Sequence, residues 1–377
     1  MASTKRQHLN NVLIVGGCGF LGQHVVTLLK EHHPECEISV MDLRLSNTLA
    51  GVTYLEGDIT SRESVDSVLS KVKPEAVIDT VSPVHGLGQA VYYKVNVDGT
   101  KVLLEASGDA GVKVFVFTSS ASVVFDGASD LISVNESAPI ASPAMDPYTE
   151  TKDGVGSQSQ RRDVYDRIET FWTFWVCLTP IPKPGAENKL TWYSLGTRPG
   201  DRQLIPGMLG VLARGQTKFQ IGNNENLFDF TYIVNAAWAH ILATEKLIAL
   251  SLDTPKTPET PDGETYFITN GEPCYFWDFP RTIWAIRGHI APFHIVMPAA
   301  VGVAMGGAAE LFAWLLNREP GLSRFRVRFS CWNRYFDIRK ARQMLGYQPL
   351  VKLYDGLVET LKWFDEQEKM ETAKKGQ

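Results

Sequence analysis

The feature that most constrains the fold is a glycine-rich turn near the N-terminus. The segment GGCGFLG (16–22) follows the apolar run VLIV (12–15) directly and comes just before a helical pattern. Gly16, Gly19 and Gly22 are spaced as G-x-x-G-x-x-G. Glycines permit a tight turn here, and the backbone N–H groups that start the helix can bind a pyrophosphate. The sequence therefore predicts a strand, a phosphate-binding turn and a helix, in that order.

Strand and helix patterns continue to alternate through the first third of the chain. Four further apolar runs predict strands: ISVMD (38–42), VTYLEGD (52–58), AVIDT (76–80) and VFVFTSS (114–120). Such alternation favours α/β units, which right-handed crossovers join into a doubly wound parallel sheet of the Rossmann type. We expect a cofactor domain at 1–200 and a smaller C-terminal substrate lobe at 201–365 that partly returns to the sheet. Residues 366–377 are expected to form a disordered tail.

An acidic residue follows the turn at the distance that a dinucleotide site requires. Asp42 ends the second predicted strand, where a carboxylate accepts hydrogen bonds from an adenosine ribose and repels a 2′-phosphate. This favours NAD over NADP, although Arg44 lies nearby. Asp58 either contacts the adenine or belongs to the cap region of the next helix. The predicted cofactor-binding residues are Gly16, Gly17, Gly19, Phe20, Leu21, Gly22, Asp42, Asp58, Ile59 and Ser119.

A second group of residues suits proton transfer. Tyr148 and Lys152 are four residues apart, so on a helix they share one face. A lysine ammonium beside a phenol lowers the phenol pKa from about 10 toward the working range, and such a phenol can take the proton of a hydroxyl. Ser120 ends the fifth predicted strand, where open α/β sheets bind ligands. We predict that Ser120, Tyr148 and Lys152 are catalytic; the alternative is that they are ordinary surface residues.

Composition argues against several other classes of protein. The formal charge of −5 and the pI of about 5.9 give no electrostatic basis for nucleic-acid binding. Five widely spread cysteines indicate free thiols, with neither a disulfide framework nor a metal site. The polar start MASTKRQHLNN lacks the apolar core of a signal peptide, so secretion is not expected. His32 and His33, before Pro34, are expected at the surface.

One apolar stretch raises the question of a membrane. Within residues 295–316 only Glu310 is charged, but the stretch is rich in alanine and glycine. A buried or substrate-lining helix, an interfacial membrane helix and a membrane span all remain open. Arg324, Arg326 and Arg328 follow at alternate positions, so on a strand they would share one face. That face would be either a solvated edge or a site that attracts anionic headgroups or a substrate carboxylate.

Taken together, these motifs resemble the extended short-chain dehydrogenase/reductase family. The segments that carry the resemblance are GGCGFLG, GDIT (57–60), NVDGT (96–100), TSSASVVF (118–125) and YTETK (148–152). Within that family the chain is similar to the 3-beta-hydroxysteroid dehydrogenase branch, and most of all to the fungal sterol-4-alpha-carboxylate 3-dehydrogenases (decarboxylating). The segments behind this narrower likeness are RQLIPGML, NLFDFTYIVNAAWAH, YFITNGEPCYFWDF and RYFDIRKARQMLGYQPL.

The resemblance implies both a reaction and a place of action. It implies NAD-dependent oxidation of the 3β-hydroxyl of a 4α-carboxysterol with decarboxylation, in the C4-demethylation steps of ergosterol biosynthesis. We therefore expect a sterol or other polycyclic 3-alcohol as substrate, other C4-demethylation enzymes as partners, and no nucleic acid. The expected location is the cytosolic face of the endoplasmic reticulum membrane, or the cytoplasm. Open alternatives are a 3-hydroxy triterpenoid or meroterpenoid dehydrogenase of secondary metabolism, and a catalytically impaired NAD- or sterol-binding homologue.

One block departs from the family pattern. Residues 153–197 do not match the helix, loop and strand that normally follow the lysine, and Arg198-Pro199 resumes the pattern with a shortened loop. Either a translated intron or shifted reading frame produced this block, or the protein has truly diverged. The apolar run FWTFWVCL (171–178) suits a buried strand or an exposed patch. From the chain as written we expect weakened NAD-dependent turnover and poor solubility.

Overall fold

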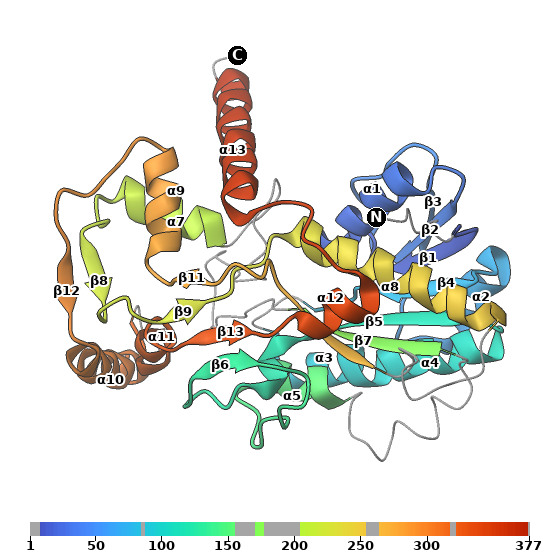
Figure 1. The fold of residues 1–377 in the computed structure, drawn as a ribbon, viewed down its shortest axis with the longest axis horizontal. Coiled ribbons are helices and arrows are strands. Elements are labelled where there is room, and N and C mark those ends of the chain that lie inside the picture. Colours follow the sequence, from blue (N-terminus) through green and yellow to red (C-terminus); the bar gives the residue numbers. More distant parts are fainter. Residues whose placement is uncertain are drawn as a thin grey trace.

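Seven parallel strands form the sheet that the alternating pattern predicts (Figure 1). The computed structural model of the chain describes residues 8–83, 87–154, 170–176, 204–253, 264–316 and 322–375. The strand order is β10-β7-β5-β4-β1-β2-β3. The strands are β1 (Asn11–Val15), β2 (Glu37–Asp42), β3 (Thr53–Glu56), β4 (Ala76–Asp79), β5 (Val114–Ser120), β7 (Thr170–Val176) and β10 (Thr265–Ile268). The order reverses between β1 and β4, and doubly wound sheets bind their ligands beside that reversal.

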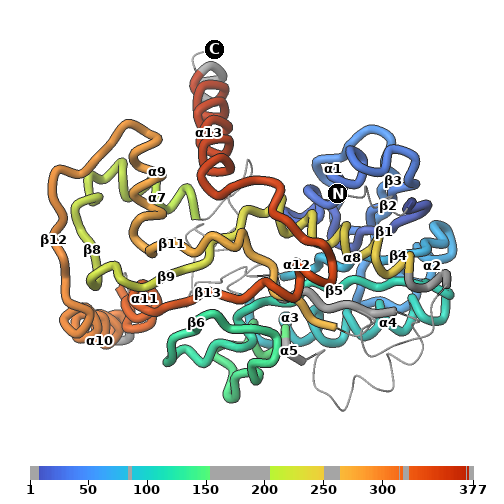
Figure 2. Tube along the Cα trace, in the orientation of Figure 1, coloured from blue at the N-terminus to red at the C-terminus, as the bar shows by residue number. Residues whose placement is uncertain are grey.

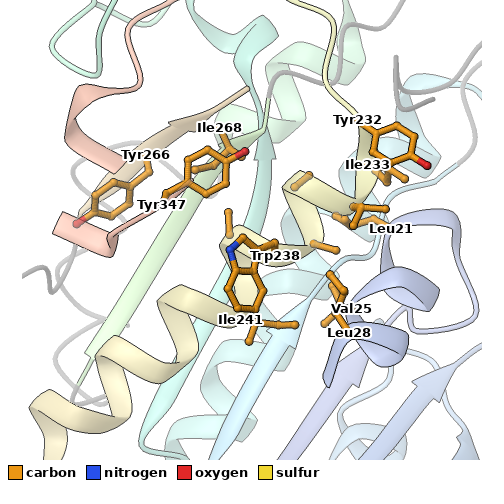
Figure 3. Close-up of a cluster of buried hydrophobic side chains, with 14 of the residues drawn as sticks. Leu21, Val25, Leu28, Tyr232, Ile233, Trp238, Ile241, Tyr266, Ile268 and Tyr347 are labelled. Atoms are coloured by element: carbon orange, nitrogen blue, oxygen red, sulfur yellow. The ribbon is translucent and has the colours of Figure 1, made fainter. Parts of the chain in front are cut away.

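Helices cover both faces of this sheet because its strands are apolar on both sides. The covering helices are α1 (Phe20–His32), α2 (Arg62–Val72), α4 (Thr100–Asp109) and α8 (Ile233–Asp253). Ile14 of β1 and Ile78 of β4 belong to the core that includes α1 and α8, whereas Leu13 and Val77 belong to the core that includes α2 and α4. In Figure 3, Leu21, Val25 and Leu28 of α1 lie beside Trp238 and Ile241 of α8. The alternation of side chains along each strand therefore divides the core into two layers.

Four short helices lie near the carboxyl ends of the strands, and one of them, α5, carries Tyr148 and Lys152. The four are α3 (Gln89–Tyr92), the π-helix η1 (Tyr93–Gly99), the 3-10 helix η2 (Ala121–Val124) and α5 (Pro147–Gly154). Pro147 is the first residue of α5, where its missing N–H leaves no helical hydrogen bond unmade. Ser119 at the end of β5 donates its hydroxyl to the Lys152 carbonyl at 3.0 Å, which holds α5 against the sheet.

A strand from the divergent block completes the sheet. β7 pairs in parallel with β5, from Val114↔Thr170 to Ser120↔Val176, and with β10 on its other side. Residues 171–176 of the run FWTFWVCL therefore belong to a strand, one of the two roles that its composition suits. Residues 155–169 and 177–203, which hold the remainder of the block and Arg198-Pro199, lie outside the described residues.

The smaller lobe consists of two small sheets with helices around them. One sheet has the order β11-β9-β13-β6 and the other pairs β12 with β8. The strands are β6 (Leu131–Val134), β8 (Phe219–Ile221), β9 (Leu227–Phe228), β11 (Cys274–Tyr275), β12 (Ile295–Met297) and β13 (Arg334–Phe336). The helices of this part are α7 (Leu204–Ala213), α9 (Asp278–Ile286), α10 (Ala299–Leu315) and α11 (Arg324–Phe329). Figure 2 shows β8 and β12, far apart in sequence, side by side at the end of the molecule.

The C-terminal part of the chain contacts both the large sheet and the smaller lobe. Helix α12 (Arg339–Leu345) packs against β10, and α13 (Leu353–Lys375) packs against α9. The expected disordered tail is helical as far as Lys375. Arg287, after α9, explains part of this extension because its Nη1 lies 2.7 Å from Asp365 Oδ1 and 3.8 Å from Glu368 Oε2.

Two further expectations change. Arg324, Arg326 and Arg328 lie on helix α11, not on a strand, because Ser323 caps the helix by accepting the Arg326 N–H at 3.1 Å. His33 is buried and its Nε2 lies 2.8 Å from Glu245 Oε1, and the His32 ring contacts Trp238, so neither histidine is a simple surface residue. Within the described part of the chain, no helix is both long enough and apolar enough to span a bilayer.

Candidate active site

The glycine turn between β1 and α1 has the geometry of an anion-binding cradle. Gly16 has a φ of +78°, which favours glycine. A Cβ on Gly22 would lie 2.4 Å from the Gly16 carbonyl oxygen and 2.6 Å from Gly17 Cα, so only glycine fits there. Gly19 is the N-cap of α1 and offers no side chain to the free N–H groups, and the first turn contains no acid. These features fit a bound pyrophosphate.

Asp42 lies at this turn, as its spacing predicts. Its Oδ2 accepts the Cys18 N–H at 3.0 Å, so the carboxylate lies beside the glycine-rich segment at the carboxyl end of β2. Asp58 instead accepts the Thr60 N–H at 2.8 Å, just before Ser61 caps α2. Asp42 thus lies beside the glycine-rich turn, and its role as a ribose acceptor stays a prediction, while the contacts of Asp58 are those of the cap region of a helix.

The other predicted cofactor residues divide between the core and the rim of the turn. Leu21 and Ile59 are buried in the two hydrophobic cores, so their side chains serve packing. The ring of Phe20 meets His24 edge-on at 5.4 Å. Ser119 is buried, with its hydroxyl on the Lys152 carbonyl. Any contact between these four residues and a cofactor stays a prediction.

Tyr148 and Ser120 come together, as the sequence predicts. The buried Tyr148 phenol forms hydrogen bonds with the side chains of Ser82 and Ser120. Ser120 Oγ lies 2.8 Å from Ser122 Oγ, which accepts a hydrogen bond from Thr149 at 3.3 Å. A connected set of hydroxyl groups therefore begins at the phenol. Motif reasoning missed Ser122, although it is the third serine of the TSSAS segment.

Lys152 is held by the main chain. Its Nζ donates to the carbonyl oxygens of Val81 at 3.0 Å and Thr118 at 3.3 Å. The ammonium also lies over the Phe117 ring, 5.4 Å from its centroid. Lys152 thus spans the carboxyl ends of β4 and β5, on the same helix as Tyr148.

Without a bound cofactor, the pKa of Tyr148 is raised and not lowered as the sequence predicted. Burial raises the pKa of Tyr148 to about 12, although hydrogen bonds from Ser82 and Ser120 oppose this. Burial lowers the pKa of Lys152 to about 8, and the charge of Asp79 acts in the opposite direction. The expected lowering of the Tyr148 pKa by Lys152 is therefore wrong for this state, because loss of hydration outweighs the other effects.

Two polar residues near Lys152 and Tyr148 were not predicted. Asp79 ends β4 and is 1% exposed; its Oδ1 accepts the Val81 N–H at 2.9 Å. An acid closing the apolar run AVID was the available signal. Asn96, within the π-helix, donates its side-chain amide to Thr151 Oγ1 at 3.0 Å. Short π-helical segments often occur at functional sites, but nothing in the sequence pattern marks one here.

Sequence comparisons place the chain among known proteins. The sequence model of the 3-beta hydroxysteroid dehydrogenase/isomerase family matches residues 13–156 and 197–299. The unmatched interval falls inside the block 153–197 that departs from the motif pattern. A Schizosaccharomyces pombe protein named sterol-4-alpha-carboxylate 3-dehydrogenase, decarboxylating, is 43% identical over 366 residues, covering 96% of this chain and 99% of its own. The Saccharomyces cerevisiae protein of that name is 38% identical, covering 95% and 99%, and the human one 32%, covering 93% and 87%.

Solved structures share the fold. The Bordetella bronchiseptica enzyme WbmH in complex with NAD+ superposes with a TM-score of 0.64 at 15% identity, covering 95% of this chain and 99% of its own. A UDP-glucose-4-epimerase from Stenotrophomonas maltophila, solved with bound NAD and formylated UDP-arabinopyranose, gives a TM-score of 0.67 at 20% identity, covering 96% and 99%. At these identities the likeness concerns the fold, and it confirms the predicted α/β architecture.

Proposed function

This chain belongs to the 3-beta hydroxysteroid dehydrogenase/isomerase family, and from that membership we propose that it oxidises the 3β-hydroxyl of a 4α-carboxysterol with NAD and releases CO2. The names of its fungal relatives, at 38–43% identity over nearly their full lengths, support the substrate. The observation that carries the proposal is the hydrogen bond between Tyr148 and Ser120 at the carboxyl end of the sheet. The glycine-rich turn after β1 lies at the same edge of the sheet.

The residues suit the removal of a proton from an alcohol. NAD, when bound, would accept the hydride from carbon 3. Tyr148, once deprotonated, takes the hydroxyl proton, and Ser120 donates a hydrogen bond to the same oxygen. Lys152, on the same helix, would supply a positive charge that favours formation of the phenolate before it takes the proton. Burial of the phenol keeps water away from this step.

The second half of the reaction follows from the substrate. Oxidation leaves a ketone at carbon 3 beside the carboxylate on carbon 4. When the bond from carbon 4 to the carboxylate breaks, its electron pair moves toward the ketone oxygen, CO2 leaves, and an enolate remains that takes up a proton. Hydrogen bonds from Ser120 and from a reprotonated Tyr148 would stabilise that oxygen.

Asp42 supports NAD over NADP within this proposal. Its carboxylate lies at the turn with Oδ2 on the Cys18 N–H, where a 2′-phosphate would meet a second negative charge. Arg44, two residues on, contacts the same acid through its backbone N–H at 3.5 Å, and its side chain is exposed. The acid therefore contacts the glycine-rich turn directly, which favours NAD in this proposal.

The direct test is turnover by the purified chain. The assay supplies a 4α-carboxy-3β-hydroxysterol and NAD, and follows NADH absorbance together with release of labelled CO2. Equal amounts of NADH and CO2 support the proposal. NADH from a 3-hydroxy triterpenoid or meroterpenoid, but not from the sterol acid, would favour the secondary-metabolism alternative. Binding of NAD or sterol without turnover would favour the impaired homologue.

The divergent block bears on the same test. Sequencing the transcript across codons 150–200 distinguishes a translated intron or shifted frame from a truly diverged protein. If the transcript encodes a different segment, we expect that version to have the higher turnover. If it encodes the present segment, the assay above measures the turnover of a protein that contains the divergent block.

We also propose that the free end of the smaller lobe contacts the membrane of the endoplasmic reticulum on its cytosolic side. Exposed apolar side chains gather on α10 and directly after it, on β12 and β8, and in the loop that precedes β12: Phe219, Ile290, Phe293, Ile295, Val296, Val301, Met305, Leu311, Phe312, Leu315 and Leu316. Helix α11 packs on α10 and adds exposed Arg324 and Arg328. An apolar helix face bordered by cations suits an anionic lipid surface.

Vesicle flotation tests this location. Wild-type protein should float with vesicles that contain anionic lipid, and a Phe312→Asp/Leu315→Asp variant should remain with the soluble fraction. Tyr354→Asp on α13 is the matched control, because Tyr354 is similarly exposed but lies on another helix. Equal flotation of all three proteins would contradict the proposal.

A further inference from the structure

We propose that Asp79 is the positioning residue of the proton-transfer site: it fixes both carbonyl groups that bind Lys152 and supplies the negative charge that balances the buried ammonium. This inference rests on the proposed function, since it assigns Lys152 its supporting group. Asp79 is the last residue of β4, and its Cα pairs with Val15 of β1 and Phe117 of β5. It therefore lies between the strand that leads into the glycine turn and the strand that ends in Ser120.

The hydrogen bonds show how Asp79 controls the two carbonyl groups. Its Oδ1 accepts the Val81 N–H at 2.9 Å, which bends the chain after β4, and the Val81 carbonyl then accepts from Lys152 Nζ at 3.0 Å. Its own main-chain carbonyl accepts the Thr118 hydroxyl at 2.8 Å, and the Thr118 carbonyl also accepts from Nζ, at 3.3 Å. The side chain of Asp79 thus positions the Val81 carbonyl, and its main chain positions the Thr118 carbonyl.

The second carboxylate oxygen points to an electrostatic role. Asp79 is 1% exposed, and its Oδ2 has no hydrogen-bond partner among the described residues. A buried carboxylate without full hydrogen bonding is costly unless a nearby positive charge compensates it. Burial raises the pKa of Asp79 to about 6 and lowers the pKa of Lys152 to about 8, and the charge of each group opposes the shift of the other. A structural asparagine would satisfy the Val81 N–H equally well, so the charge itself calls for an explanation.

Other groups around Lys152 do not provide that balance. From β5 it faces the Phe117 ring and the Thr118 carbonyl, and on its own helix Tyr148 is a neutral phenol at physiological pH. Tyr92 of α3 lies beside Tyr148, with ring centroids 5.9 Å apart, and is likewise a phenol. Among the described residues, Asp79 is the one charged side chain that shifts the pKa of Lys152.

The test compares Asp79→Asn, which keeps an oxygen for the Val81 N–H but removes the charge, with Asp79→Ala, which removes both. In Asp79→Asn we expect the KM for NAD to stay within about threefold of wild type while kcat falls about tenfold near pH 8. The alkaline limb of the kcat profile should move to lower pH by on the order of one unit, because a less compensated ammonium loses its proton more readily. In Asp79→Ala, kcat should fall further than in Asp79→Asn.

A measurement without turnover separates this inference from the proposed function. The pH at which Lys152 titrates can be followed by NMR of 13C-labelled lysine, with the resonance assigned from Lys152→Arg. Asp79→Asn should lower that pH, whereas Asp126→Asn, on an exposed turn after η2, should not. An unchanged Lys152 titration in Asp79→Asn overturns the inference even if the sterol assay succeeds. A lowered titration together with no sterol turnover in wild type supports the inference and rejects the proposed reaction.

Discussion

The Lys152 ammonium donates a hydrogen bond to the main-chain carbonyl of Val81, with Nζ and the oxygen 3.0 Å apart, just beyond the end of β4. The backbone that follows the buried strand β4 therefore holds the positive charge of Lys152 at the carboxyl end of the sheet. Helix α5 brings the Tyr148 phenol to Ser82 and Ser120 by a separate set of contacts. Both groups of the YTETK segment lie on α5, but their side chains contact different partners, so each can be substituted alone.

Removing the phenol should remove turnover without removing cofactor binding. We expect Tyr148→Phe to lower kcat by about 10²–10⁴-fold, since the base for the substrate hydroxyl is lost. NAD affinity, measured by fluorescence quenching, should change little. Tyr93→Phe is the matched control, because the Tyr93 phenol bonds to Glu150 at 2.6 Å on the exposed side of the same helix pair. Full turnover in Tyr148→Phe would contradict the assigned base.

The phenol of Tyr148 should titrate only at high pH in the protein alone. Burial raises its pKa to about 12, so the difference in absorbance near 295 nm between wild type and Tyr148→Phe should develop above pH 11. Adding NAD should move that change to lower pH, because a nearby positive nicotinamide favours phenolate. If the titration stays in place with NAD, the cofactor ring and the phenol are not neighbours.

A methyl group on Gly22 should destroy the cradle. The added Cβ would lie 2.4 Å from the Gly16 carbonyl oxygen, so the turn and the start of α1 must separate. We expect Gly22→Ala to lower the free energy of unfolding by about 1–3 kcal/mol in a urea titration and to abolish NAD binding. Gly88→Ala serves as the control because nothing lies within 4 Å of a Cβ there, and it should behave like wild type. NAD binding that survives in Gly22→Ala would exclude this turn as the phosphate site.

Replacing the acid at the end of β2 should change cofactor preference. In Asp42→Ala the ribose loses an acceptor and the Cys18 N–H loses its partner, so KM for NAD should rise about tenfold or more. KM for NADP should fall, because the charge that repels a 2′-phosphate is gone. The ratio of kcat/KM for the two cofactors measures the change. An unchanged ratio would show that residue 42 does not meet the ribose.

His240 should make the protein less stable in mild acid. Burial lowers the pKa of this histidine to about 4, so it contributes stability that is complete above its unfolded pKa of about 6.5 and is lost as the pH falls toward 4. Between about pH 7.5 and pH 5 this loss amounts to about 2 kcal/mol. Urea titrations of wild type and His240→Gln at both pH values isolate it. Burial also raises the pKa values of Asp79 and Asp229, but both acids are present in both proteins, so their effects cancel.

The sequence predicted the parts of the fold that repeat a pattern. Apolar runs located β1 to β5, and the spacing from Gly16 to Asp42 located the cradle and its acid, because tight turns and strand ends need particular residue types. The alternating Arg324 and Arg326 suggested a strand, but the Ser323 cap and the packing of Val327 produced a helix. A short segment of six residues carries too little periodicity to decide between the two.

The candidate site was predictable in its members and less so in its electrostatics. Ser120, Tyr148 and Lys152 were identifiable from residue type and order, and the phenol does reach Ser120. The partners of Lys152 are main-chain carbonyls, which no residue letter reveals. The direction of the Tyr148 pKa depends on burial, which is set by tertiary packing. Asp79 was visible as an acid in an apolar run, but its relation to Lys152 required the strand order.

Strand β7 occupies its place in the large sheet although its sequence departs from the family pattern. A parallel strand is recognised by its neighbours through backbone amides, which are alike in every sequence, so an apolar segment of unrelated origin can occupy the position between β5 and β10. A family member altered at this position would still look intact to any method that reads topology, and only its handling of substrate would reveal the exchange.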